Sequence, residues 1–77
     1  MAIERRTYVE IRKSILETLV KGPRSIHEVA SNSKVNWRTT ELHLNYLKGR
    51  ELVEEMFAHR RLRVFNITDK GRKSIDE

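Results

Sequence analysis

Apolar residues recur at helical spacing near the start of the chain. The main stripe of this first segment consists of Tyr8, Ile11, Ile15 and Leu19. At its start, the sequence T-Y-V-E from Thr7 is a capping box, in which a threonine and a glutamate satisfy each other's backbone N–H groups. Gly22 is followed by a proline, and this pair ends a helix because proline cannot continue it. The pattern predicts a helix that begins near Thr7 and ends before Gly22.

A second segment, from Ser25 to Lys48, has the pattern of two capped helices joined by a short turn. Ser25 and Glu28 form another capping box, and Asn36 is an N-cap candidate for the helix that follows. The apolar stripe of that last helix consists of Trp37, Thr40, Leu44 and Leu47. The positions off this stripe include Arg38, Glu41, Leu42, His43, Asn45 and Tyr46. Because the turn is too short for the helices to lie antiparallel, the segment predicts a helix-turn-helix.

After this segment the apolar pattern changes to that of strands. The ranges Leu52–Phe57 and Leu62–Ile67 are rich in residues that favour strands, and alternation places Phe65 and Ile67 on the same side. The range Ala58–Arg61 between them lacks the Gly, Asn or Asp that a tight two-residue turn prefers. We therefore expect a hairpin with a looser loop.

The end of the chain predicts one more helix. Thr68 is its N-cap, and Asp69 lies favourably at the N-terminal end of the helix dipole. The helix should extend to about Ile75, although Gly71 weakens it. Taken together, the pattern predicts a single α+β domain over residues 1–77. It has a three-helix core, a two-stranded hairpin and a short C-terminal helix.

Composition and charge restrict the class of protein. The chain has 77 residues, enough for one domain with a small core. Lysine and arginine total 16 against 11 aspartate and glutamate, and the formal net charge of +5 favours a polyanionic partner. The sequence has no cysteine, no apolar run long enough to cross a membrane and no signal-peptide pattern. We therefore expect a cytoplasmic protein without membrane association.

Residues for catalysis or metal binding are not grouped in the sequence. The three histidines, His27, His43 and His59, lie in separate predicted elements and have no cysteine partners. There is no glycine-rich phosphate loop, and Glu54 and Glu55 point to opposite faces of a strand. We expect no enzyme activity, no catalytic residue, no metal, no cofactor and no small-molecule ligand.

Two stretches of sequence resemble a known family. The run L-N-Y-L-K-G-R-E-L-V-E-E, Leu44–Glu55, is similar to a recognition-helix end followed by the first wing strand. The run F-N-I-T-D-K-G-R, Phe65–Arg72, is similar to the segment that closes the wing. With the order of elements, they resemble the winged helix-turn-helix regulators, most closely small archaeal or archaeal-viral members. Glu51 departs from the glycine usual there, and the resemblance does not extend to the long C-terminal dimerisation helix of several relatives.

The resemblance implies a double-stranded DNA partner, with the third helix in the major groove. The implied contacts on that helix are Trp37, Arg38, Thr39, Glu41, Leu42, His43, Asn45 and Tyr46. An arginine such as Arg38 can bind guanine through two hydrogen bonds, unless it is a solvated side chain balanced by Glu41. The asparagine and the histidine can reach adenine or phosphate. Leu42 and Tyr46 can contact DNA or pack together, and Trp37 fits core-boundary packing better than stacking on bases.

The remaining implied DNA contacts are cationic residues in the hairpin and around the helices. A cationic hairpin tip can clamp phosphates or enter the minor groove, although runs of charge are often simply solvated. The set comprises Arg24, Lys34, Lys48, Arg50, His59, Arg60, Arg61 and Arg63.

The first helix carries more apolar residues than its main stripe. Val9, Leu16 and Val20 widen the apolar arc to roughly 180°, against about 100° for a helix buried on one side. The wide arc indicates either a helix buried centrally in a small domain or a contact with a second subunit. We predict a homodimer with these three residues at its interface.

The combined prediction is a sequence-preferring DNA-binding protein, a transcriptional regulator that acts at the nucleoid. Two alternatives remain open. One is a winged-helix module that binds another protein and whose basic surface is incidental. The other is a nucleoid-associated protein that binds DNA without sequence preference.

Overall fold

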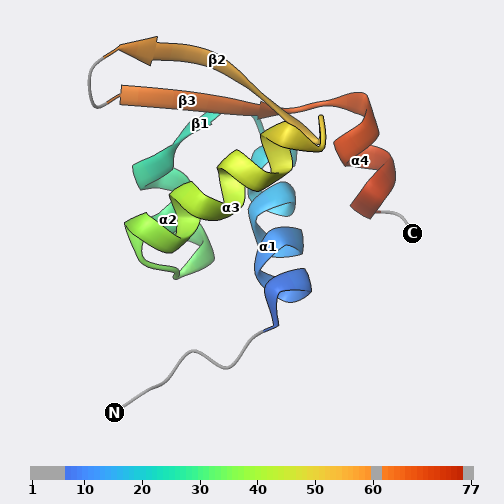
Figure 1. Ribbon diagram of the computed structural model, residues 1–77, viewed down its shortest axis with the longest axis horizontal. Helices are drawn as coiled ribbons and strands as arrows, with labels where there is room; N and C mark the ends of the chain where they lie inside the picture. Colours follow the sequence, from blue (N-terminus) through green and yellow to red (C-terminus); the bar gives the residue numbers. More distant parts are fainter. Residues whose placement is uncertain (1–6, 60–61, 76–77) are drawn as a thin grey trace.

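The computed structural model describes residues 7–59 and 62–75. Its elements are α1 (Tyr8–Val20), β1 (Arg24–Ser25), α2 (Ile26–Ser33), α3 (Trp37–Gly49), β2 (Val53–His59), β3 (Leu62–Ile67) and α4 (Asp69–Ile75). Helices α1, α2 and α3 pack together on one side of the sheet, and α4 lies at one end of the molecule beside α1 (Figure 1). The predicted α+β fold is confirmed.

The helices begin where the caps predict. Thr7 and Glu10 form the capping box of α1, with hydrogen bonds of 3.1 and 2.9 Å. Ser25 and Glu28 form that of α2, at 3.2 and 3.0 Å. Before α3, the side-chain oxygen of Asn36 accepts a hydrogen bond of 2.8 Å from a backbone N–H. These three predicted starts are confirmed, because an N-cap depends on residues only three apart in sequence.

A left-handed residue that is not glycine follows each of α2 and α3: Lys34 caps α2, and Glu51 comes after the Arg50 cap of α3. Lys34 has a φ of 58° and Glu51 a φ of 64°. After α3, the Glu51 N–H donates to the carbonyl of Lys48 at 3.0 Å, and the Leu52 N–H donates to the carbonyl of Leu47 at 2.9 Å. These two bonds form a Schellman motif. Glu51 thus adopts the conformation expected of the missing glycine, which costs a non-glycine residue about 1–2 kcal/mol.

Strand β2 extends further toward the hairpin tip than predicted. Strands β2 and β3 are antiparallel, and their pairing continues to His59 opposite Leu62. Ala58 and His59 belong to β2, so the prediction that they lie in a loop is wrong, while Arg60 and Arg61 lie outside the described residues. A bulge between Glu55 and Phe57 changes the register. Cross-strand pairing therefore prevails here over the absence of favourable turn residues.

A third strand joins the sheet, which the sequence prediction missed. Arg24 and Ser25 of β1 pair antiparallel with Phe65 and Val64, so the strand order is β1-β3-β2. Two residues are too few for an alternating pattern, and the partners lie far along the chain. The predicted two-stranded hairpin is thus the larger part of a three-stranded sheet.

The core lies between the three helices and the inner face of the sheet. It consists of Ile11, Ile15, Leu16, Leu19, Ile26, Val29, Leu44, Leu47, Val53, Phe65 and Ile67. The predicted stripe of α1 is confirmed except at Tyr8, which is 69% exposed. Phe65 and Ile67 both face inward, as strand alternation predicts.

Leu16 belongs to this core. Only 4% of its surface is exposed, and the partly buried Leu52 and Ile75 pack against the core cluster that contains it. Its predicted role in a dimer interface is therefore wrong, because α4 folds back onto α1 and onto Leu52, just before β2. Val9 and Val20 are exposed.

Gly71 allows α4 to pack tightly against the segment before β2. A Cβ at this position would clash with the backbone carbonyl oxygen of Leu52 and would lie 2.7 Å from Cγ1 of Ile67. The same Leu52 carbonyl accepts a hydrogen bond of 3.1 Å from the N–H of Thr68. The glycine that weakens this helix locally is thus required by its packing.

Candidate nucleic-acid interface

Helix α3 has one buried side and one exposed side. Thr40, Leu44 and Leu47 are buried against the rest of the domain, as predicted. Trp37, at the start of the helix, lies at the core boundary: it is 37% exposed, and its ring centroid is 6.0 Å from that of His27. The exposed side is therefore the surface of α3 that is available to a partner.

Three side chains dominate this exposed side. Arg38, Leu42 and Asn45 are all exposed, Leu42 by 63%. They follow one another at spacings of four and three residues, so they lie along one face of the helix. Within residues 7–59 and 62–75, Arg38 has no ion pair or hydrogen bond through its side chain. This face thus offers a free guanidinium, an aliphatic surface and an amide in a row.

His43 does not lie on this face. It is 6% exposed and accepts a hydrogen bond of 3.3 Å at Nδ1 from Nε of Arg12 on α1, while the Tyr8 ring packs edge-on at 5.2 Å. Burial, together with the Arg12 guanidinium, lowers the pKa of His43, so the neutral ring that accepts this bond is favoured. The predicted exposed placement of His43 is wrong, because α1 covers this side of α3.

Tyr46 and Arg12 form a second contact between α1 and α3. The Arg12 guanidinium carbon lies 3.7 Å from the centroid of the Tyr46 ring. The Arg50 guanidinium carbon lies 6.0 Å from the same centroid. Tyr46 is nevertheless 42% exposed. Leu42, Tyr46 and the half-buried Thr39 all line a hollow with α1. The contact with Arg12 therefore favours a packing role for Tyr46.

Arg63 joins the hairpin to α3. Its Nε donates to Oε2 of Glu55 at 2.7 Å, and one terminal nitrogen donates to Oε1 of the same carboxylate at 3.1 Å. The other terminal nitrogen donates to Glu41 on α3 at 3.2 Å. A further bond of 3.1 Å reaches Oδ1 of Asn45. The side chain is only 23% exposed, so Arg63 is occupied within the protein rather than free for phosphate, contrary to the prediction.

Glu55 is the centre of this network. It also accepts a hydrogen bond of 2.9 Å from Lys48, and its side chain is 11% exposed. The hydrogen bonds from Arg63, with a smaller contribution from Lys48, lower the pKa of Glu55 to about 2. Glu41 and Lys48, both predicted as DNA contacts, are thereby engaged in ion pairs within the protein.

The other predicted cationic contacts lie in several elements. Arg24 is half-buried on β1 and donates to the carbonyl of Pro23 at 3.0 Å. Lys34 and Arg50 are exposed at the ends of α2 and α3, and His59 is exposed at the end of β2. These four residues therefore lie on different elements of the fold and do not form one cluster. Arg60 and Arg61 lie outside the described residues.

Sequence reasoning missed two residues of this site. Glu55 shares a strand face with the buried Val53, because alternate residues of a strand point the same way, and this signal was enough to predict an inward-facing Glu55. Arg12 has no such signal, because it lies beside the apolar stripe of α1 and its partners are on another helix. Its bond to His43 spans 31 residues of sequence.

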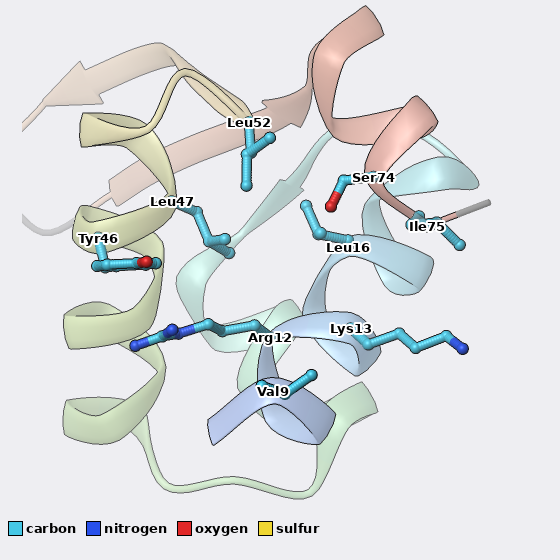
Figure 2. A pocket seen from close by; sticks show the side chains of 9 residues that line it. All are labelled: Val9, Arg12, Lys13, Leu16, Tyr46, Leu47, Leu52, Ser74 and Ile75. Atoms are coloured by element: carbon cyan, nitrogen blue, oxygen red, sulfur yellow. The ribbon is translucent and has the colours of Figure 1, made fainter. Parts of the chain in front are cut away.

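A groove lies between α1, the end of α3 and α4. It has a volume of about 330 Å³, and Figure 2 shows Leu16, Leu47 and Leu52 along it, with Arg12 extending toward Tyr46.

In the described part of the chain, no group of three His, Cys, Asp or Glu side chains could hold a metal ion. None of the described helices is long and apolar enough to cross a membrane.

The chain matches a known family over almost its whole length. A family model described as winged helix-turn-helix matches residues 5–77. No curated protein matches the chain in a sequence search.

Solved structures share the fold. The transcriptional regulator BldR from Sulfolobus solfataricus superposes with a TM-score of 0.77 and 27% identity over 84% of this chain and 48% of BldR. A homodimeric winged helix-turn-helix DNA-binding domain, Mb0332 from Mycobacterium bovis, has a TM-score of 0.69 and 26% identity over 86% of this chain and 58% of that one. Sso10a-2, a DNA-binding protein from Sulfolobus solfataricus, has a TM-score of 0.79 over 94% of this chain and 73% of that one. Its 21% identity shows likeness in fold alone. The chain spans about half the length of BldR.

Proposed function

Because this chain belongs to the winged helix-turn-helix family, we propose that it binds double-stranded DNA with a sequence preference and regulates transcription. In this proposal α3 lies in the major groove, and the β2–β3 hairpin lies along the neighbouring backbone or minor groove. The observation that carries it is the exposed side of α3, where Arg38, Leu42 and Asn45 project in a row. No catalytic residue is part of the proposal.

The chemistry of this face suits base recognition. The guanidinium of Arg38 keeps its donors for O6 and N7 of guanine, the commonest specific contact in the major groove. Leu42 can pack on a thymine methyl group, and Asn45 can form hydrogen bonds with a base edge. The net charge of +5 supports attraction to phosphate, which supplies affinity without sequence information.

We further propose that the protein acts as a homodimer at the nucleoid. Two recognition helices can enter successive major grooves only when they are about 34 Å apart on a two-fold axis. Val9 and Val20 lie on one face of α1 and are 71% and 41% exposed, which leaves them available to a second copy. The homodimeric state of the related domain Mb0332 supports the same assembly.

Binding titrations across a range of salt concentrations test the DNA-binding proposal. Fluorescence anisotropy would compare a duplex enriched from a random pool with an unselected duplex of equal length. We expect tighter binding to the enriched duplex, and affinity for both duplexes should fall as salt rises because counterions are released from phosphate. Lys70→Ala is a matched control, since it removes one exposed cation from α4, at the opposite end of the molecule from the start of α3 (Figure 1).

The other two functions predict different results in these titrations. A sequence-neutral nucleoid protein would bind both duplexes equally, with the same salt dependence. A protein-interaction module would bind neither duplex. Either result would show that the exposed side of α3 does not distinguish base sequences.

A further inference from the structure

The amide of Asn45 on α3 is held by the hairpin. A terminal nitrogen of Arg63 on β3 donates to Oδ1 of Asn45 at 3.1 Å. A guanidinium can only donate, so the amide oxygen, and not its nitrogen, must face Arg63. The NH₂ group of Asn45 donates to no other side chain or backbone group in the described part of the chain. The partner therefore decides which end of the amide points outward.

Arg63 has little freedom to turn away. Its paired bonds to Glu55, at 2.7 and 3.1 Å, hold the plane of the guanidinium, and Glu41 holds its other side at 3.2 Å. Paired bonds between a guanidinium and a carboxylate are both strong and geometrically specific. The guanidinium carbon also lies 5.1 Å from the ring centroid of the buried Phe65. Arg63 thus has a fixed place between the hairpin and α3.

We propose that Arg63 is a positioning residue for DNA recognition, which turns the NH₂ group of Asn45 outward so that Asn45 selects bases with a keto oxygen. This inference rests on the proposed function. In the major groove, guanine offers two acceptors, O6 and N7, and thymine offers O4, whereas adenine offers N7 alone beside an amino group that can only donate. An outward NH₂ group therefore suits guanine or thymine.

This orientation disfavours the adenine contact expected from the sequence. A freely turning asparagine binds adenine through both ends of its amide, since Oδ1 accepts from N6 while the NH₂ group donates to N7. When Oδ1 faces Arg63, only the donating end is directed toward DNA. The Arg63 charge is at the same time balanced by Glu41 and Glu55, so Arg63 adds no phosphate contact of its own.

Selection of binding sites from a random duplex pool tests the inference. The pool would be bound by the wild type, by Asn45→Ala and by Arg63→Met, with folding checked by circular dichroism and thermal unfolding. The base contacted by Asn45 is the position where Asn45→Ala loses its preference. We expect guanine or thymine there for the wild type, and an adenine at that position should weaken wild-type binding about tenfold.

The Arg63→Met variant removes every donor while Lys48 still pairs with Glu55. We expect it to bind the adenine duplex within about threefold of the guanine or thymine duplex, because the freed amide can make both adenine bonds. Its salt dependence should match that of the wild type. If Arg63→Met does not fold, Asn45→Asp is the second variant: it can still pair with Arg63 but has no NH₂ group, so the keto preference should disappear.

The outcomes separate this inference from the proposed function. If the wild type enriches no sequence, the proposed function and this inference both fail. If the wild type enriches a sequence with adenine at the Asn45 position, or if Asn45→Ala changes no position, only the inference fails. It also fails if Arg63→Met weakens binding equally for all four bases, because that result shows a purely structural role.

Discussion

Two arginines of the candidate interface differ in their exposure and in their bonding partners. Arg38 is exposed on α3 and has no side-chain partner among residues 7–59 and 62–75, whereas Arg63 is bonded to Glu55, Glu41 and Asn45. A guanidinium has five donors in a fixed geometry. Those of Arg38 remain available to a base, while Arg63 uses its donors within the protein. The residue type is the same, and only the neighbours separate a candidate contact from a structural role.

Replacement of Arg38 by alanine should reduce discrimination between sequences. We expect Arg38→Ala to cost about 1–3 kcal/mol of binding free energy on the enriched duplex and much less on an unselected one. Anisotropy titrations on both duplexes measure the difference, with Lys70→Ala as the matched loss of one exposed cation. Equal losses on the two duplexes would assign Arg38 to a phosphate contact.

Two glycines should respond in opposite directions to the same change. Gly71→Ala places a methyl group against the Leu52 carbonyl oxygen, so we expect about 1–3 kcal/mol lower unfolding free energy. Gly49→Ala is the matched control, since nothing lies within 4 Å of its added Cβ. There alanine should stabilise the helix by about 0.5–1 kcal/mol. Urea unfolding of both variants measures the change in unfolding free energy. If Gly71→Ala leaves that free energy unchanged, α4 can shift to make room for the methyl group.

At the scale of elements, a network of ion pairs centred on Glu55 connects the hairpin to α3. Glu55 on β2 accepts hydrogen bonds from Arg63 on β3 and from Lys48 on α3. Arg63 itself also donates to Glu41 and Asn45 of α3. We therefore expect the placement of the hairpin against α3 to depend on the charge on Glu55.

The ion pairs of Glu55 should make the free energy of unfolding depend on pH in the acidic range. The pKa of Glu55 falls from 4.5 to about 2 on folding, so its contribution is complete above 4.5 and is lost as pH falls from 4.5 through 2. Glu55→Gln should lower the unfolding free energy by about 1–3 kcal/mol at neutral pH. The difference in unfolding free energy between Glu55→Gln and the wild type should shrink as the pH falls from 4.5 to about 2. Denaturant unfolding at several pH values measures this.

Glu54→Gln is the matched control for that experiment. Glu54 is the neighbouring residue, is exposed, and makes no ion pair with any residue of the described part of the chain. Its replacement should change neither stability nor its dependence on pH. If Glu54→Gln and Glu55→Gln behave alike, the effect comes from overall charge rather than from the contact between hairpin and helix.

At the scale of the whole molecule, one small domain offers a limited DNA contact. A single module of this kind buries about 600–1,000 Å² of protein surface on DNA, and large dimers bury more. The principal dimensions of the domain are 36 × 34 × 21 Å. A homodimer that doubles the contact is therefore the assembly that fits specific recognition. With Leu16 in the core, Val9 and Val20 remain as its candidate surface on α1.

The double variant Val9→Glu/Val20→Glu should shift a dimer toward monomers. Both side chains are exposed, so helical content by circular dichroism should not change, while sedimentation equilibrium should show the smaller species. Leu62→Glu is the control, because Leu62 lies on the hairpin and is also exposed, by 48%. If the wild type is a monomer at tens of micromolar, there is no dimer to explain. If only Leu62→Glu dissociates it, the interface lies on the hairpin.

Local features of the sequence were sufficient for the order and starts of the helices, the helix-turn-helix and the two main strands. Capping boxes act over three residues and apolar periods over one or two turns, so neither needs knowledge of distant segments. The net charge and the residues opposite the stripe of α3 likewise follow from the sequence. For this reason Arg38 and Leu42 were assigned correctly to the exposed side of α3.

Only the tertiary structure decided which neighbours the other residues meet. His43 became buried because α1 lies over it and brings Arg12, and Leu16 because α4 folds back onto α1. Strand β1 exists only through its pairing with β3. Arg63 is not a free cation, because the hairpin places it beside Glu41, with which it forms an ion pair. Each of these contacts joins residues far apart in sequence, and burial and electrostatics depend on distance in space, which no local pattern contains.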